Sequence, residues 1–301
     1  MKKFIQTTIL ALAAVVLIIP MQGQTLNYKR SKCDVNSDGE INIADVNTVI
    51  DAIFGGGEED DPQAITFTVK GVSFTMIPVE GGTFTMGGTE EQGSDAYDWE
   101  YPVHQVTLSD YSIGQTEVTQ ELWVAVMGNN PSYHNDNLQC PVEKVSWNDC
   151  QEFIAELNRL TGKHFRLPSE AEWEFAARGG NKSQHYKYSG SNDIGEVAWY
   201  YDNSYAVGSS SPDYGTHPVG KKKCNELGLY DMAGNVWEWC QDRYGSYSSA
   251  AQTNPTGPSE GSNRVGRGGG WFSNARDCRV SRRGYNSPSG WNSDLGLRLA
   301  L

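Results

Sequence analysis

Hydrophobic and polar residues alternate in short runs from residue 65 onward. Apolar side chains occupy every second position in residues 65–69 and again in 74–78. Because successive side chains of a strand point to opposite faces, a period of two predicts half-buried β-strands. The segment Gly81–Gly87 (Gly-Gly-Thr-Phe-Thr-Met-Gly) predicts a turn that leads into a further strand.

Longer segments repeat their apolar residues at helical spacing, and each lies between local start and stop signals. Ser, Thr and Asp side chains cap the first turn of a helix, and glycine ends a helix readily. The predicted helices run from the cap Thr119 to Met127 before Gly128, from the capping pair Ser146 and Asp149 to near Gly162, and over residues 170–178 behind the capping box Ser169 and Glu172. Beyond Gly180 the chain is mostly turns and aromatic residues, so the pattern predicts an irregular α+β domain.

Composition supports a packed domain rich in loops. The 301 residues include 33 Gly, 15 Tyr and 9 Trp, and disordered chains are poor in aromatic residues. The formal net charge of −13 would repel a phosphate backbone, which argues against a nucleic-acid partner.

The first residues have the pattern of a targeting segment. Lys2 and Lys3 precede an apolar run from Ile9 to Pro20. This run is short for a bilayer span, and the pattern is typical of a secretory signal peptide, placed at residues 1–23. No later segment is apolar enough to cross a membrane. We therefore expect a secreted, periplasmic or cell-surface protein that is not an integral membrane protein.

Residues 31–57 predict a calcium loop followed by one helix. The expected ligand residues are Asp34, Asn36, Asp38, Glu40, Asn42 and Asp45. Calcium takes six to eight oxygen ligands, and Gly39 permits the sharp turn that brings alternate side chains to one ion. The loop resembles a single dockerin repeat, which implies a cohesin-like partner. Dockerins carry two repeats, so the alternative is a small calcium-stiffened spacer. An acidic linker, placed at 58–71, follows it and precedes a large domain placed at 72–301.

Seven ordered motifs give the large domain a specific resemblance. They are Gly81–Gly87, Glu117–Thr119, Pro141-Val142 with Val145–Trp147, Arg166–Glu174 (Arg-Leu-Pro-Ser-Glu-Ala-Glu-Trp-Glu), Gly228–Trp239 (Gly-Leu-Tyr-Asp-Met-Ala-Gly-Asn-Val-Trp-Glu-Trp), Arg267–Trp271 and Leu295–Arg298. In this order they resemble the formylglycine-generating, or sulfatase-modifying factor, family. The resemblance implies an elaborated C-type-lectin-like fold, although a fold does not by itself fix a function.

That family oxidises a sulfatase cysteine to formylglycine with oxygen and Cu(I), which two cysteines hold. Aligned residue by residue, the second of these cysteines is Cys278, whereas Ser273 stands at the first and Gly270 stands where the family has a serine. Soft thiolates suit Cu(I), and a hard hydroxyl holds it far less well. The sequence therefore predicts that copper chemistry is lost. Cys278 is then a buried thiol or half of a disulfide, and the pairing of the six cysteines cannot be deduced.

The resemblance also implies a calcium site within Gly228–Trp239. Asp231 and Glu238 would supply side-chain oxygens, while Gly234 and Val236 would supply backbone carbonyls. The alternative is a turn held only by hydrogen bonds.

Two functions remain open. The first is a binding or accessory module that displays loops to a glycan or peptide ligand through Trp271, Tyr285 and Trp291, since stiff aromatic rings amid Ser, Asn and Gly are typical of adaptable binding surfaces. This run also resembles the variable region of retroelement-diversified lectin-fold proteins. The second is a divergent oxidoreductase that generates formylglycine.

Overall fold

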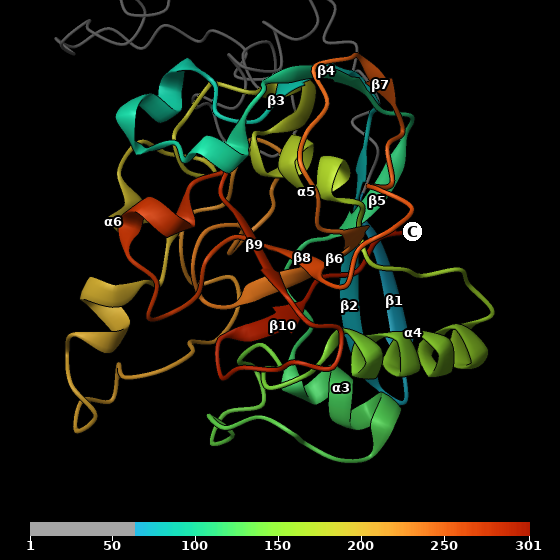
Figure 1. Ribbon diagram of the computed structural model, residues 1–301. Helices are drawn as coiled ribbons and strands as arrows, with labels where there is room; N and C mark the ends of the chain where they lie inside the picture. The colour runs from blue at the N-terminus through green and yellow to red at the C-terminus, as the bar shows by residue number, and fades with distance from the viewer. Residues whose placement is uncertain (1–63) are drawn as a thin grey trace, which may run out of the picture. The chain divides into compact units, whose positions relative to one another are not determined.

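The structure, a computed structural model, describes residues 64–301 (Figure 1). The expected signal peptide, the calcium loop with its six ligand residues, and Cys33 lie outside the described residues. Within 64–301, none of the helices has the length and apolar character needed to cross a membrane.

The alternating residues after 64 form the first sheet. β1 (Ile65–Val69) pairs antiparallel with β2 (Val72–Val79), whose other edge pairs with β5 (Tyr111–Gly114). Lys70 and Gly71, with φ of 48° and 88°, make the tight turn between β1 and β2. β1 lies in the range 58–71 that the sequence assigned to a linker, and it pairs with β2 of the large domain.

All the predicted helices are present with the predicted caps. They are α3 (Gln120–Met127), α4 (Trp147–Thr161) and α5 (Glu170–Ala177). The hydroxyls of Thr119, Ser146 and Ser169 each accept a hydrogen bond from a backbone N–H in the first turn. α3 and α4 end at glycines with left-handed φ, Gly128 and Gly162. These boundaries follow local sequence rules because capping groups lie within a few residues of the turns that they satisfy.

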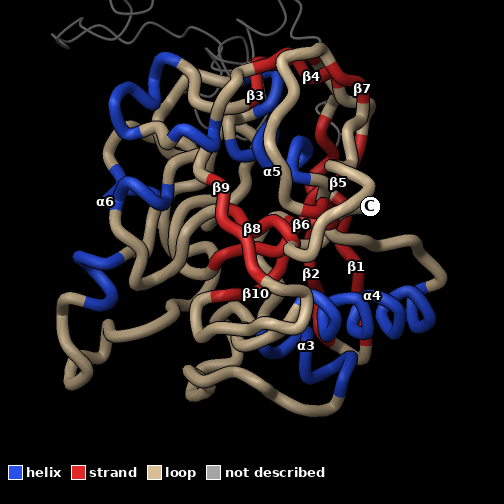
Figure 2. Tube along the Cα trace, in the orientation of Figure 1, coloured by secondary structure: helices blue, strands red, loops and turns tan. Residues whose placement is uncertain are grey.

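The rest of the chain builds small sheets joined by long loops (Figure 2). One sheet has the order β10 (Leu295–Leu297), β6 (Trp237–Arg243), β8 (Arg264–Arg267) and β9 (Arg283–Asn286). Another joins β3 (Thr83–Met86), β4 (His104–Thr107) and β7 (Gln252–Thr253). The short helical segments are Glu90–Asp95, Asp98–Glu100, Gly180–Lys182, α6 (Ile194–Val197), the π-turn Tyr201–Tyr205 and Ala275–Cys278.

Two apolar clusters and several buried ion pairs hold these elements together. α3 and α4 pack on β1 and β2, while α5 packs against β3 and β6 (Figure 1). Arg267, Arg279 and Arg298 are fully buried. They pair with Glu174, Glu100 and Glu238 respectively, at 2.5–2.6 Å. A buried charge persists only when it is paired and hydrogen-bonded, so these arginines fix loops that no regular element holds.

Candidate functional site

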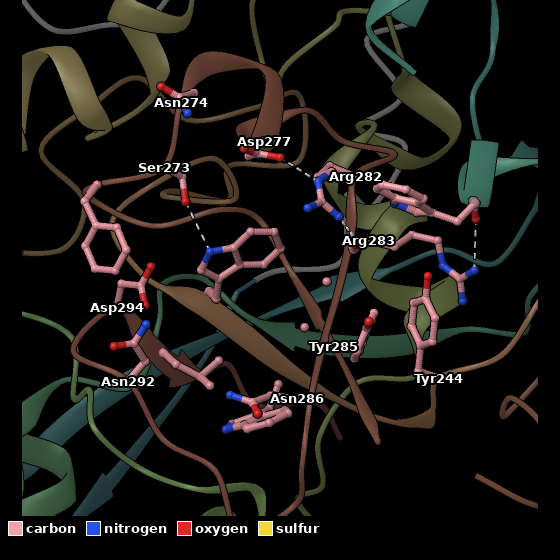
Figure 3. Close-up of a pocket in the computed structure, with 17 residues that line it drawn as sticks. Tyr244, Ser273, Asn274, Asp277, Arg282, Arg283, Tyr285, Asn286, Asn292 and Asp294 are labelled. Carbon is pink, nitrogen blue, oxygen red and sulfur yellow. Dashed lines mark hydrogen bonds and ion pairs between the residues drawn. The ribbon is translucent and has the colours of Figure 1, made fainter. Parts of the chain in front are cut away.

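A cavity of about 800 Å³ opens where the β10-β6-β8-β9 sheet meets the segments around residues 272–277 and 292–295 (Figure 3). Its lining combines aromatic rings, amides, carboxyl groups and guanidinium groups. Such a mixture of flat apolar walls and a few polar groups is typical of small-ligand sites.

Trp237, the first residue of β6, lines the cavity beside β8 and β9. The sheet leaves room for its indole because two glycines face it: a Cβ added to Gly284 would lie 2.9 Å from the ring, and one added to Gly266 would lie 3.8 Å away. The Trp237 Nε1–H donates to Ser273 Oγ at 3.2 Å (Figure 3). The indole N–H therefore holds the hydroxyl of Ser273, the residue that aligns with the first of the family's two copper-binding cysteines.

Ser273 is occupied as a hydrogen-bond acceptor. Its Oγ accepts from Trp237 Nε1 and also from the backbone N–H of Gly270 at 3.0 Å. A hydroxyl oxygen has two lone pairs, so both are in use.

Cys278 follows Ala275–Asp277 in a 3₁₀ turn and is fully buried. Its Sγ lies against Gly269, where an added Cβ would approach to 2.7 Å. Burial raises the pKa of the Cys278 thiol, and the carboxyl groups of Asp277 and Asp294 raise it further. The group is therefore a neutral thiol. None of the five cysteines among the described residues forms a disulfide, so the buried-thiol alternative applies to Cys278.

Gly270 is constrained by Asp294. A Cβ at position 270 would lie 2.7 Å from the Asp294 Cβ and 2.8 Å from its Oδ2. The Asp294 side chain therefore fills the space that a serine at 270 would need. Asp294 is 3% exposed. Burial raises the pKa of its carboxyl to about 7, with a further contribution from the Glu143 carboxylate.

The predicted aromatic contacts are in three different environments. Tyr285 lines the cavity and is 60% exposed. Trp291 is 58% exposed but is not part of the lining, and the Lys144 Nζ lies 5.3 Å from its ring centroid. Trp271 is buried, and its Nε1–H donates to the Ser293 carbonyl. Of the three, Tyr285 alone contributes to this cavity, and Trp271 is a core residue.

The two predicted side-chain ligands for calcium, Asp231 and Glu238, differ in whether they have an oxygen free to bind a cation. Asp231 Oδ2 accepts from the Gly220 N–H at 2.7 Å, while its Oδ1 is buried without a hydrogen-bond partner. Both oxygens of Glu238 are bound by Arg298, and Oε2 also accepts from the Trp173 Nε1–H at 2.6 Å. Asp231 therefore has an oxygen free for a cation, and Glu238 does not.

Three carboxyl groups, those of Asp231, Glu117 and Glu238, are buried close to one another here. The buried Glu117 carboxyl has its pKa raised well above the usual range by burial and by the Asp231 and Glu238 carboxylates. Arg298 is the cation that faces this group. Within the described part of the chain, no three His, Cys, Asp or Glu side chains gather as a metal site. A calcium ion here would have to rely on backbone carbonyls.

Sequence reasoning missed Asp294 and Trp99, both of which line the cavity. These two residues come from segments far apart in the sequence, and only the folded chain places them in one cavity. Asp294 carried a local signal, since it is an acidic residue at the end of a neutral run of Ser, Asn and Gly.

Comparison with known proteins supports the resemblance. Residues 66–301 match the family model described as the sulfatase-modifying factor enzyme 1-like domain. The chain is 35% identical over 274 residues to the chaperone protein LppX of Paenibacillus barcinonensis, covering 76% of this chain and 89% of that protein. It is 29% identical over 284 residues to the formylglycine-generating enzyme of Streptomyces coelicolor, covering 75% and 88%.

A solved structure shows the same fold. Treponema denticola variable protein 1 superposes with a TM-score of 0.70 at 37% identity, covering 79% of this chain and 99% of that one. The predicted fold class, an irregular α+β domain of the sulfatase-modifying factor type, is therefore confirmed. Similarity to both a chaperone and an enzyme leaves the choice between accessory and catalytic roles to the site.

Proposed function

This chain belongs to the sulfatase-modifying factor family, and we propose that it acts there as a ligand-binding or accessory module, not as a copper-dependent oxidase. The proposal includes export by the segment at residues 1–23 and a calcium-stiffened spacer at 31–57. Its ligand is a glycan or peptide held in the cavity beside Trp237.

The coordination of Ser273 carries the proposal. Its Oγ already accepts two hydrogen bonds, at 3.0 and 3.2 Å, so it has no lone pair left for a metal. Cys278 is the only sulfur at this position among the described residues, and burial raises the pKa of its thiol, so deprotonation by a metal would cost free energy. Cu(I) binding requires deprotonated soft ligands. A single neutral thiol beside a saturated hydroxyl does not meet that requirement, so the residues present do not fit the copper ion.

The shape and lining of the cavity beside Trp237 support ligand binding in place of copper chemistry. It holds about 800 Å³, which suits a small-molecule group or a side chain of a larger ligand. Tyr285 and Trp99, 60% and 45% exposed, stand at its rim. Large, stiff rings give contact area at low entropic cost, and the amides of Asn274, Asn286 and Asn292 supply adaptable hydrogen bonds.

A calcium ion in the large domain is part of the same proposal. The orphaned, buried Asp231 Oδ1 supports it, because an unpaired carboxylate oxygen away from water is costly. The ion would be held by Asp231 with the Gly234 and Val236 carbonyls, and its role would be to stabilise the loop. Glu238 would take part only on release from Arg298.

The first experiment separates binding from catalysis. The purified protein is supplied with Cu(I), oxygen and a cysteine-containing sulfatase peptide, and the peptide mass is followed. We expect no aldehyde from the wild type. We also expect none from Ser273→Cys, because Cys278 stays buried and the carboxyl groups of Asp277 and Asp294 still raise the pKa of its thiol. Aldehyde formation by the wild type would establish the divergent oxidoreductase instead.

The second experiment tests the cavity. Glycan and peptide arrays are probed with the wild type, Tyr285→Ala and Trp291→Ala. Both variants remove an aromatic ring that is more than half exposed, and only Tyr285 lines the cavity. Loss of array signal in Tyr285→Ala, with retention in Trp291→Ala, supports the proposal. Equal signals in both variants would place binding elsewhere.

A further inference from the structure

The charged groups that line the cavity are paired, with one exception. Arg282 Nε donates to Asp277 Oδ1 at 2.7 Å. Arg283 forms an ion pair with the buried Glu170 at 2.6 Å. Asp294 has neither a salt bridge nor a hydrogen bond to its carboxyl from another residue among those that the structure describes. The cavity therefore holds one carboxyl group without a cationic partner. Its pKa of about 7 leaves it partly ionised at neutral pH, and its own backbone N–H is its hydrogen-bond donor.

Asp294 is both buried and directed at the cavity. It is 3% exposed and belongs to the lining, beside Asn292 and on the same side as Ser273 (Figure 3). Gly270 lies against both the Cβ and the Oδ2 of Asp294, at 2.7 and 2.8 Å from an added Cβ, so there is no room for a side chain at position 270. The carboxyl can thus meet a ligand only from the cavity side.

The groups around Asp294 do not supply the missing positive charge. Glu143 is buried on a neighbouring loop, and its Oε2 also lacks a hydrogen-bond partner. The Cys278 thiol and the Asp277 carboxylate lie on the adjacent 3₁₀ turn. A buried carboxylate is stable only when it is paired, so the ligand is the remaining source of a cation.

The aromatic and apolar residues of the cavity restrict which kind of cationic group can bind near Asp294. The Arg282 guanidinium lies 5.5 Å from the Trp237 ring, 5.6 Å from Trp99 and 4.9 Å from Tyr97. The planar guanidinium of Arg282 therefore already lies against the aromatic rings at the Trp99 and Trp237 end of the cavity. Leu295, which follows Asp294 in the sequence, and Phe272 also line the cavity and offer apolar surface on which an aliphatic stem can pack. A compact ammonium group on an apolar stem fits this end better than a second guanidinium.

We propose that the cavity recognises an aliphatic ammonium group, as on a lysine side chain of a peptide ligand, through the carboxylate of Asp294. This inference rests on the proposed binding function and specifies the chemical class of its ligand.

The test uses the full chain and three probes that share one frame, the N-acetyl methylamides of lysine, norleucine and glutamate. Binding is measured by calorimetry and by saturation-transfer NMR. Asp294→Asn keeps the shape of the side chain and removes its charge. Asp242→Asn is the matched control, because Asp242 is an equally buried carboxyl, 3% exposed, that lines a different cavity.

We expect the lysine amide to bind the wild type and Asp242→Asn, and to bind Asp294→Asn at least about tenfold more weakly, since hydrogen bonds between ionised groups are the strong ones. Asn292→Lys provides a second test that keeps Asp294. Asn292 is an exposed residue of the cavity lining, so the ammonium group introduced there should compete with the lysine amide for Asp294 and weaken its binding. Trp291 is not part of the lining, so Trp291→Lys should leave the binding of the lysine amide unchanged.

Three results would overturn the inference: lysine-amide affinity unchanged in Asp294→Asn, equal affinity for the norleucine amide, or no binding of the lysine amide by the wild type. None of these affects the proposed binding function, which the Tyr285→Ala array comparison and the copper assay test independently.

Discussion

Replacing Arg298 by methionine should strongly destabilise the domain. Arg298 is completely buried, and its guanidinium binds Glu238 through Nη2 at 2.6 Å and Nε at 2.9 Å. It also donates to the Gly114 carbonyl at 2.9 Å and to the Tyr230 carbonyl at 2.8 Å. One side chain therefore joins β10, β6, the end of β5 and the loop that carries Asp231.

The expected loss of unfolding free energy follows from the groups that the Arg298→Met substitution leaves unpaired. Methionine fills much of the volume but leaves the Glu238 carboxylate buried without its cation. Breaking a buried pair in this way costs about 3–5 kcal/mol. For a domain of this size each kcal/mol lowers the melting temperature by about 2–4 °C, so we expect a decrease of roughly 6–20 °C.

Urea unfolding followed by tryptophan fluorescence measures the loss. Arg159→Met is the control, because its partner is Glu156 in a surface pair and the arginine side chain is 68% exposed. That variant should unfold like the wild type. The double variant Arg298→Met/Glu238→Leu should recover part of the loss, since it removes the stranded charge. A single Arg298→Met variant within about 1 kcal/mol of the wild type would refute the reasoning about buried charge.

Three further predictions concern the cation, pH and the thiols. Calcium added to chelated protein should raise the melting temperature of the wild type and not of Asp231→Asn, as calorimetry would show; equal shifts would exclude Asp231 as a ligand. Burial raises the pKa of Asp242 from its usual 3.8 to about 7, so the stability that its proton contributes is lost as pH rises through 7. Asp242→Asn should therefore gain roughly 1–3 kcal/mol relative to the wild type between pH 5 and pH 8 in urea titrations, and a constant difference would contradict this pKa. Iodoacetamide should label Cys224, which is half-buried, before the fully buried Cys278 in native protein, as peptide mass spectrometry would show; early labelling of Cys278 would mean that its loop opens.

The helices were predictable because their signals are local. Ser146 accepts a hydrogen bond from the Asp149 N–H three residues away, and the Asp149 carboxylate accepts one from the Ser146 N–H. A capping box of this kind is readable in any sequence that carries it. The family motifs were equally informative about the fold, since most of them lie in the buried parts of the chain.

The site was only partly predictable, because its key contacts join distant residues. Gly270 is small because Asp294 lies against it, and no rule of spacing links these two positions. Trp271 and Trp291 are the same residue type in the same predicted surface, yet one is 3% and the other 58% exposed. Tertiary packing alone decides which ring is available to a ligand.

The proposed loss of the copper site and the proposed charged anchor would rest on the same residues. Asp294 fills the space over Gly270 that a serine would occupy, and its carboxyl helps to keep the Cys278 thiol protonated. The hydroxyl of Ser273 is fixed by Trp237 and the Gly270 N–H, so it cannot turn toward a metal. A single Ser273→Cys substitution changes none of these contacts except its own, because Asp294 still adds negative charge beside the neighbouring thiol. The site therefore disfavours a soft cation that needs two thiolates and favours a hard cationic group that needs one carboxylate.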